Sequence, residues 1–95
     1  MKKISLQING SPVTVKVSKW TGRPGANGIR IIANRDSLSL LRECLEVMYN
    51  INIHIYIEDS GLYIPEEDAT CLEEETIILG LKEASKRGWL NNPTL

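Results

Sequence analysis

The strongest constraint in this sequence is a pair of alternating runs on either side of Asn9-Gly10-Ser11-Pro12. Hydrophobic residues take every second position, first at Ile4, Leu6 and Ile8 and then at Val13, Val15 and Val17. Strict alternation is typical of a strand with one buried face, and Asn-Gly is a preferred sequence for a tight hairpin turn. The sequence therefore predicts a β-hairpin whose polar face is turned toward water.

Further strands and loops follow from local composition. Residues 29–33 contain three isoleucines, isoleucines alternate with polar residues over 51–57, and residues 62–64 form a short apolar run before a proline. These three segments are predicted as strands. Glycines and a proline indicate a loop over 19–27, and an acidic loop is expected over 66–70.

One long amphipathic helix is predicted at about 37–49. Leucines and a methionine recur there at spacings of three and four, with charged residues off the stripe. Asn34 and Asp36 both offer an N-cap oxygen, and Asn50 is a plausible stop.

The segment after Leu72 fits two structures. Acidic residues precede its apolar centre and basic residues follow it, which favours a helix because such charges complement the helix dipole. The run over 76–79 is β-branched, however, and Gly80 costs about 1 kcal/mol in a helix. A strand over 76–81 with a short helical turn after it is the competing interpretation, and residues 91–95 are expected to form a frayed tail.

Together these elements predict one α+β domain over residues 1–95. A mainly antiparallel sheet opens with the hairpin and is covered by the helix. No run approaches the ~20 apolar residues that span a bilayer. Polar residues interrupt the apolar positions near the N-terminus, so we do not expect this segment to be a signal peptide. A cytoplasmic protein is therefore expected, and its two cysteines, Cys44 and Cys71, are interpreted as structural thiols.

The net charge of −1 is unevenly distributed along the chain. Residues 1–35 hold seven Lys or Arg and no acid, giving +7. Residues 36–81 hold one Arg and eleven acids, giving −10, and residues 82–95 hold three basic residues and one acid, giving +2. This segregation is the main sequence clue to function.

The acidic stretch from residue 58 to residue 75 is the candidate site. It contains eight acids and neither Lys nor Arg: Glu58, Asp59, Glu66, Glu67, Asp68, Glu73, Glu74 and Glu75. Such a run is either a solvated edge or a docking surface that attracts a basic partner. The apolar residues Leu62, Tyr63 and Ile64 lie within it, and Tyr63 is the expected anchor.

Catalytic and metal-binding signatures are missing from the sequence. The glycine-rich residues 21–28 precede a strand rather than a helix and lack the Lys-Ser/Thr pair of a phosphate loop. His54 has no nucleophile that sequence places beside it, and the calcium-loop and zinc patterns are absent. We therefore expect no enzyme activity, no cofactor and no metal.

A nucleic-acid-binding role is a weaker alternative. Lys16, Lys19, Arg23 and Arg30 lie near Trp20 in the sequence. The pI near 5.8 is low for a nucleic-acid-binding domain. The chain also has only five Trp and Tyr residues and no Phe, which are few aromatic rings for stacking on bases.

Several segments resemble the small cytoplasmic immunity proteins encoded beside bacterial polymorphic and contact-dependent toxins. They are Ile-Arg-Ile-Ile-Ala-Asn-Arg-Asp-Ser-Leu (29–38), Ile-His-Ile-Tyr (53–56), Asp-Ser-Gly (59–61) and Leu-Glu-Glu-Glu-Thr-Ile-Ile (72–78). The resemblance covers roughly residues 28–82. It implies a non-enzymatic protein that binds one toxin domain, often a nuclease, and blocks it, and it favours a strand over 76–81.

The first hypothesis is therefore an immunity-type protein that occludes a basic partner with its acidic surface. The second is a small regulatory or structural module that self-associates through its opposite charges or its strand edges. Neither hypothesis involves a membrane.

Overall fold

The hairpin at the N-terminus is present in the computed structural model, which describes residues 2–21, 27–69 and 72–91. Strand β1 (Lys2–Ile8) pairs antiparallel with β2 (Ser11–Thr21), and Leu6 lies opposite Val13. Asn9 and Gly10 both have positive φ, 52° and 80°, as a type I′ turn requires. The two-residue Asn-Gly turn therefore sets the register that buries Leu6, Ile8, Val13, Val15 and Val17.

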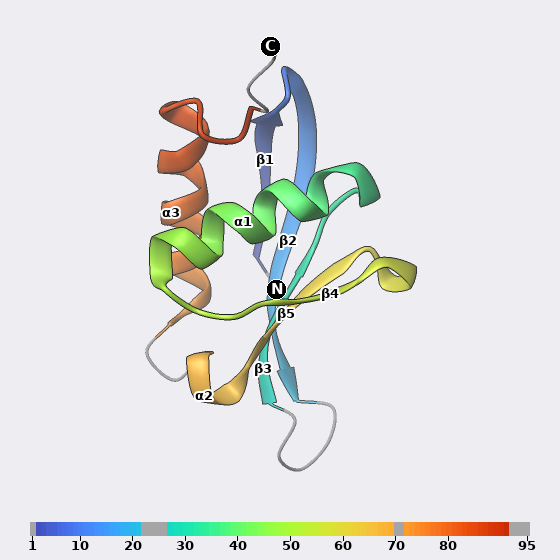
Figure 1. Ribbon diagram of the computed structural model, residues 1–95, viewed down its shortest axis with the longest axis vertical. Helices are drawn as coiled ribbons and strands as arrows, with labels where there is room; N and C mark the ends of the chain where they lie inside the picture. Colours follow the sequence, from blue (N-terminus) through green and yellow to red (C-terminus); the bar gives the residue numbers. More distant parts are fainter. Residues whose placement is uncertain (1, 22–26, 70–71, 92–95) are drawn as a thin grey trace.

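Three more strands complete a five-stranded antiparallel sheet in the order β1-β2-β3-β5-β4 (Figure 1). They are β3 (Asn27–Ile32), β4 (His54–Tyr56) and β5 (Gly61–Pro65). The loop expected over 19–27 is shorter than predicted, because Lys19 to Thr21 and Asn27 to Gly28 pair as strands. Residues 22–26 lie outside the described part of the chain.

The predicted long helix is confirmed as α1 (Leu38–Tyr49), preceded by a 3₁₀ turn, η1 (Arg35–Ser37). Of the two candidate caps, Asn34 is the one that acts: its side-chain Oδ1 accepts a hydrogen bond from the Ser37 backbone N–H at 3.1 Å. Asn50 ends the helix in the left-handed conformation, with φ 54°. Leu38, Leu41 and Leu45 form its buried stripe.

The strand predicted over 51–57 is wrong in length, because only His54 to Tyr56 pair with β5. The backbone N–H of Ile53 donates instead to Glu46 Oε2 of α1 at 3.0 Å. After Tyr56 the chain turns through η2 (Ile57–Asp59), which leaves Ile57 51% exposed. A hydrogen bond to α1 at one end and the turn at the other thus limit this edge strand to three residues.

The acidic segment 66–70 was expected to be a loop, but residues 66–69 form a short helix, α2 (Glu66–Ala69). The three acids Glu66, Glu67 and Asp68 occupy its first turn, where the positive end of the helix dipole favours them. Residue 70 lies outside the described residues.

The C-terminal segment is a helix, α3 (Glu74–Lys86), so the strand that the family resemblance favoured over 76–81 is wrong. Its apolar residues Ile77, Ile78, Leu81 and Ala84 are spaced to lie on one helical face, and all four are buried. Gly80 is accommodated at a close approach of the two long helices, since a β-carbon there would overlap the Tyr49 hydroxyl. The same hydroxyl donates to the Thr76 carbonyl at 3.0 Å.

Both long helices lie on one face of the sheet, α3 over β1 and β2 and α1 over β4 and β5 (Figure 1). Alternating strand residues on that face form the core with the helices. The other face, called here the open face, carries side chains that are exposed or half-buried. These include Lys3, Ser5, Gln7, Thr14, Lys16, Ser18, Trp20, Arg30, Ile32, His54, Tyr56 and Tyr63.

The segment after α3 meets the hairpin, where the Asn9 N–H donates to the Leu90 carbonyl at 3.0 Å. Residues 92–95 of the predicted tail lie outside the described part of the chain.

Candidate binding surface

The eight acids of the candidate site lie in two groups at opposite ends of β5. Glu58 and Asp59 belong to η2, immediately before the strand. The other six, Glu66, Glu67, Asp68, Glu73, Glu74 and Glu75, lie on α2 and at the start of α3 and are called here the acidic corner. The Leu72 N–H, just before α3, donates a hydrogen bond to the carbonyl of Ala69, the last residue of α2, at 3.1 Å. Glu66 and Glu73 line one hollow together with Lys19.

Two of these acids form ion pairs with basic residues from the N-terminal segment. Lys2 Nζ lies 2.6 Å from Glu75 Oε1, and Arg30 Nη2 lies 3.9 Å from Asp59 Oδ2. The hydrogen bond and the charge of Glu75 raise the pKa of Lys2, and the same contacts with Lys2 lower the pKa of Glu75. Part of the basic segment therefore balances part of the acidic segment within the fold.

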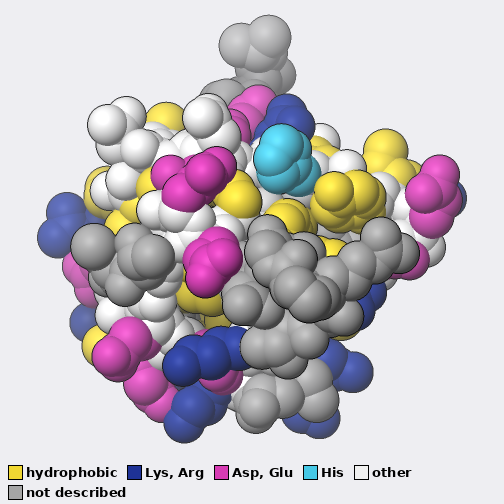
Figure 2. Space-filling model, turned by 90° about the horizontal axis from the view of Figure 1, so that it is seen from below, with side chains coloured by type: hydrophobic (Ala, Val, Ile, Leu, Met, Phe, Trp, Pro, Cys, Tyr) yellow, Lys and Arg dark blue, Asp and Glu magenta, His cyan; other side chains and the backbone are white. Residues whose placement is uncertain are grey.

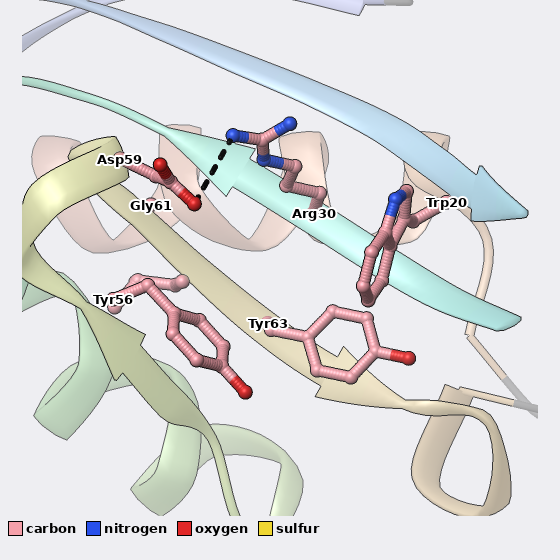
Figure 3. A pocket seen from close by; sticks show the side chains of 7 residues that line it. Trp20, Arg30, Tyr56, Asp59, Gly61 and Tyr63 are labelled. Atoms are coloured by element: carbon pink, nitrogen blue, oxygen red, sulfur yellow. Dashed lines mark ion pairs between the residues drawn. The ribbon is translucent and has the colours of Figure 1, made fainter. Parts of the chain in front are cut away.

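Between the two acidic groups, the open face holds a pocket of about 210 Å³ lined mainly by aromatic and charged side chains (Figure 3). Trp20 comes from β2, Arg30 from β3, Tyr56 from β4 and Tyr63 from β5, while Asp59 stands at the rim on η2. The Tyr63 ring lies between the other two rings in a row. Its centroid is 4.6 Å from that of Trp20, at 89° between planes, and 6.4 Å from that of Tyr56, at 62°. Both are edge-to-face arrangements, which aromatic rings favour.

Strand register and two glycines bring these rings together. Arg30 lies opposite Tyr63, Trp20 lies opposite Gly28, and Tyr56 lies opposite Gly61. A β-carbon on Gly28 would overlap the Ile64 carbonyl oxygen and come within 3.3 Å of the Tyr63 ring. The missing side chain at residue 28 thus leaves the space in which the rings of Trp20 and Tyr63 meet.

Of the three apolar residues expected to anchor a partner, the structure leaves only Tyr63 on the surface. Leu62 and Ile64 are fully buried and point to the core, because neighbouring strand residues alternate between faces. Partial burial is the largest cause that raises the pKa of Tyr63, and the nearby Tyr56 and Glu66 raise it further. Glu66, the first residue of α2, follows directly after β5 and so begins the acidic corner next to the strand that carries Tyr63.

Trp20 and Tyr56 belong to this site but were not among the residues predicted for the acidic surface, although Trp20 was named for the nucleic-acid alternative. Trp20 lies more than forty positions before Tyr63, and the pairing of β2 with β3 and of β3 with β5 brings it there. Tyr56 is close to Tyr63 in the sequence and reaches it through the pairing of β4 with β5. Alternation did place Tyr56 on the polar side of its strand, which is the one local signal that was present.

The basic residues named in the sequence divide between surfaces. Lys16 and Arg30 lie on the open face with Trp20, whereas Lys19 lies on the other side of β2 and lines the hollow beside Glu66. Arg23 lies outside the described residues. His54 is exposed opposite Tyr63 on β4, and in Figure 2 the chain's one histidine lies beside exposed hydrophobic side chains.

The pocket lining combines aromatic rings with one ion pair. Its titratable groups are Asp59, Arg30 and two tyrosines, and its lining contains no Ser, Cys, Lys or His. Across residues 2–21, 27–69 and 72–91, no three His, Cys, Asp or Glu side chains are grouped to hold a metal ion. Aromatic rings with a few polar groups are common in sites that bind ligands.

A second hollow lies on the helical side of the molecule. Leu40, Cys44, Val47 and Met48 of α1 line it with Trp89, whose ring has the Arg87 guanidinium 5.3 Å from its centroid. Partial burial raises the pKa of the Cys44 thiol. Cys71 lies outside the described residues.

No family model matches the chain, and neither a curated protein nor a solved structure matches it. Among the helices in the described part of the chain, none has the length and apolar character needed to cross a membrane.

Proposed function

We propose that this protein is a non-enzymatic protein-binding domain that docks a basic partner, with Tyr63 as the anchor. The observation that carries the proposal is the position of Tyr63. It is the central ring of the aromatic pocket, with Asp59 on the pocket rim and Glu66 close enough to raise its pKa.

An anchor of this kind matches the physics of protein interfaces. Binding energy concentrates in a few aromatic residues that seat in well-packed pockets and exclude water. Acids around such an anchor add little affinity by themselves, but they accelerate encounter with a cationic surface and disfavour acidic competitors. The acidic corner and Glu58 and Asp59 would supply that steering on either side of the pocket.

The more specific role is that of an immunity protein in the cytoplasm that blocks a toxin domain such as a nuclease. The resemblance over residues 28–82 supports it, and so does the steering that acids provide toward a cationic nuclease. One element departs from those proteins, since α3 replaces the closing apolar strand. The role therefore depends mainly on the acidic and aromatic surface.

Reversal of charge on α2 tests the acidic part of this surface. The triple variant Glu66→Lys, Glu67→Lys and Asp68→Lys should bind the C-terminal domain encoded by the reading frame immediately upstream about tenfold or more weakly. Most of the loss should appear in the association rate, and it should shrink as salt is added, because screening weakens charge steering. Stopped-flow kinetics and calorimetry at several salt concentrations measure both effects.

A matched control reverses three acids elsewhere, Asp36→Lys, Glu43→Lys and Glu83→Lys, for the same change in net charge. This control should keep an association rate closer to that of the unchanged protein, because these residues lie on η1, α1 and α3 away from the pocket. Equal affinity and equal salt dependence in the α2 variant and the unchanged protein would rule out acidic docking.

Self-association is the alternative proposal. One open strand edge belongs to β1, which pairs only with β2. Part of that edge is already covered, because Ser85 Oγ of α3 donates to the Gln7 carbonyl at 3.4 Å and the Leu90 carbonyl accepts from Asn9. Sedimentation across salt concentrations, run beside the binding assay, separates a dimer from a monomer that binds a partner.

A further inference from the structure

The open face of the sheet has a charge opposite to that of the acidic corner. Its ionisable strand side chains are Lys3 on β1, Lys16 on β2, Arg30 on β3, and His54 with two tyrosines on β4 and β5. Within the described strands, no Asp or Glu occupies a position on this face. The chain is acidic as a whole, but every charged strand residue on this face of the sheet is basic.

These side chains form a continuous row across all five strands. Lys3 lies opposite Lys16, Arg30 lies opposite Tyr63, and Tyr63 lies opposite His54. Lys16 pairs with Ile32, two residues from Arg30, so the two basic residues are diagonal neighbours. With strands about 4.8 Å apart, the row extends for roughly 19 Å.

The pocket in this row has the size and chemistry of a seat for one planar ring. At about 210 Å³ it is smaller than pockets for whole cofactors or drug-sized ligands, which begin near 300 Å³. Tyr56, Tyr63 and Trp20 offer ring surfaces and edges for stacking. The Arg30 guanidinium donates hydrogen bonds and the Asp59 carboxylate accepts them, and their 3.9 Å ion pair leaves both groups partly exposed. A nucleobase edge presents acceptors and donors to such a pair.

We propose that the open face binds single-stranded nucleic acid. One base enters the aromatic pocket, and the phosphates on one side of it follow Arg30, Lys16 and Lys3 toward β1. Basic grooves with interspersed aromatic rings are the general means of holding a single strand without sequence preference. Glu58 and Asp59 at one end of β5 and Glu66 at the other confine the backbone to the basic side of the pocket.

A duplex does not fit this arrangement. Its bases are stacked within the helix, so the rings of Tyr56 and Tyr63 cannot reach a base face. Its two phosphate strands would also bring the second backbone against the acids at the rim. Discrimination between single and double strands is therefore the signature of the proposal.

The experiment uses the full chain and a fluorescein-labelled ten-nucleotide oligouridylate or oligothymidylate, followed by anisotropy at about 50 mM salt. A Trp89→Phe background leaves Trp20 as the only tryptophan, so quenching of its fluorescence reports occupancy of the pocket. We expect binding of the single strands, Trp20 quenching, and at least tenfold weaker binding of the matching duplex. Three phosphate contacts predict a log–log salt slope of about −2.

Variants assign the binding to the row. Lys16→Glu should weaken binding about tenfold or more and flatten the salt slope, whereas the control Lys82→Glu, at an exposed lysine of α3, should change it far less. Tyr63→Ala should weaken binding about tenfold through lost stacking, and Tyr63→Phe should restore most of it. Circular dichroism confirms that each variant is folded.

The triple Lys variant of α2 separates this inference from the proposed function. It should bind the protein partner more weakly but the oligonucleotide at least as tightly, because it removes negative charge near the pocket. The inference does not rest on the proposed function, so either result can fail alone.

Three outcomes would overturn the inference. The first is no change in anisotropy or Trp20 fluorescence at about 50 mM salt, where electrostatic binding is strong. The second is equal binding of duplex and single strand with no effect of Tyr63→Ala, which would mean a non-specific charge contact. The third is quenching of Trp20 by polylysine but not by either oligonucleotide, which would assign the face to a basic protein.

Discussion

At the scale of single residues, the pocket depends on what is absent at Gly28 as much as on the rings around it. Trp20 and Tyr63 meet over a backbone position without a side chain, and the Ile64 carbonyl lies against that position from the neighbouring strand. A backbone carbonyl in the middle of a sheet cannot move aside as a flexible side chain can. The geometry of the binding surface and the stability of the sheet are therefore linked at this residue.

The variant Gly28→Ala should lower the free energy of unfolding by about 1–3 kcal/mol, the usual cost of overpacking. Urea unfolding at equilibrium measures it. Gly61→Ala is the matched control, because its β-carbon would meet the Ile31 carbonyl at 3.6 Å, an ordinary contact, and should cost clearly less. Equal losses for the two variants would contradict the role given to Gly28.

The Lys2–Glu75 pair makes a prediction about pH. The pKa of Glu75 is lowered in the folded protein, so its contribution to stability is present above the unfolded carboxyl pKa and is lost as the pH falls through the folded value. The pKa of Lys2 is raised, so its contribution is lost only at strongly alkaline pH.

Glu75→Gln should therefore lower the thermal midpoint slightly at pH 7, and this difference should diminish toward about pH 3. The effect should be small because both side chains are exposed. Glu43→Gln, at an exposed position of α1, controls for the loss of one charge. A difference that grows on acidification would show that the pair does not act as described.

At the scale of elements, the sequence predicts a strand or helix correctly where residues close together in the chain determine it. Asn9-Gly10 specifies its hairpin because both residues accept positive φ. Helix α1 has a regular leucine spacing and follows a 3₁₀ turn that the Asn34 side chain caps. Residues 76–81 could not be assigned, because their apolar run suits a strand or a helix equally. Packing of one helical face on β1 and β2 decides in favour of α3, and this is a long-range effect.

The same distinction explains how much of the candidate site could be predicted. The acids and Tyr63 were identified because they are consecutive in one stretch of chain. Trp20 could not be placed beside Tyr63, since its approach follows from the strand order β1-β2-β3-β5-β4, whereas Tyr56 meets Tyr63 through the neighbouring strands β4 and β5. That order depends on contacts between residues far apart in sequence, about which composition and spacing carry no information.

At the scale of the whole molecule, the basic and acidic segments of the chain contribute to different surfaces. The acidic corner and Glu58 and Asp59 lie at the two ends of β5, and basic strand residues lie on the open face. Lys2 and Arg30 join the fields through their ion pairs with Glu75 and Asp59. Tyr63 lies where these surfaces meet, which makes it the residue on which the whole account depends.

The most direct measurement is therefore the affinity of two variants, one at Tyr63 and one at Trp89, for the domain encoded by the reading frame immediately upstream. Tyr63→Ala removes the central ring of the pocket, while Trp89→Ala removes a ring that is 51% exposed beside α3, on the helical side. Calorimetry should show at least a tenfold rise in Kd for Tyr63→Ala, as for an interface anchor, and little change for Trp89→Ala. An unchanged Kd for a folded Tyr63→Ala variant, or a larger loss for Trp89→Ala, would contradict the account.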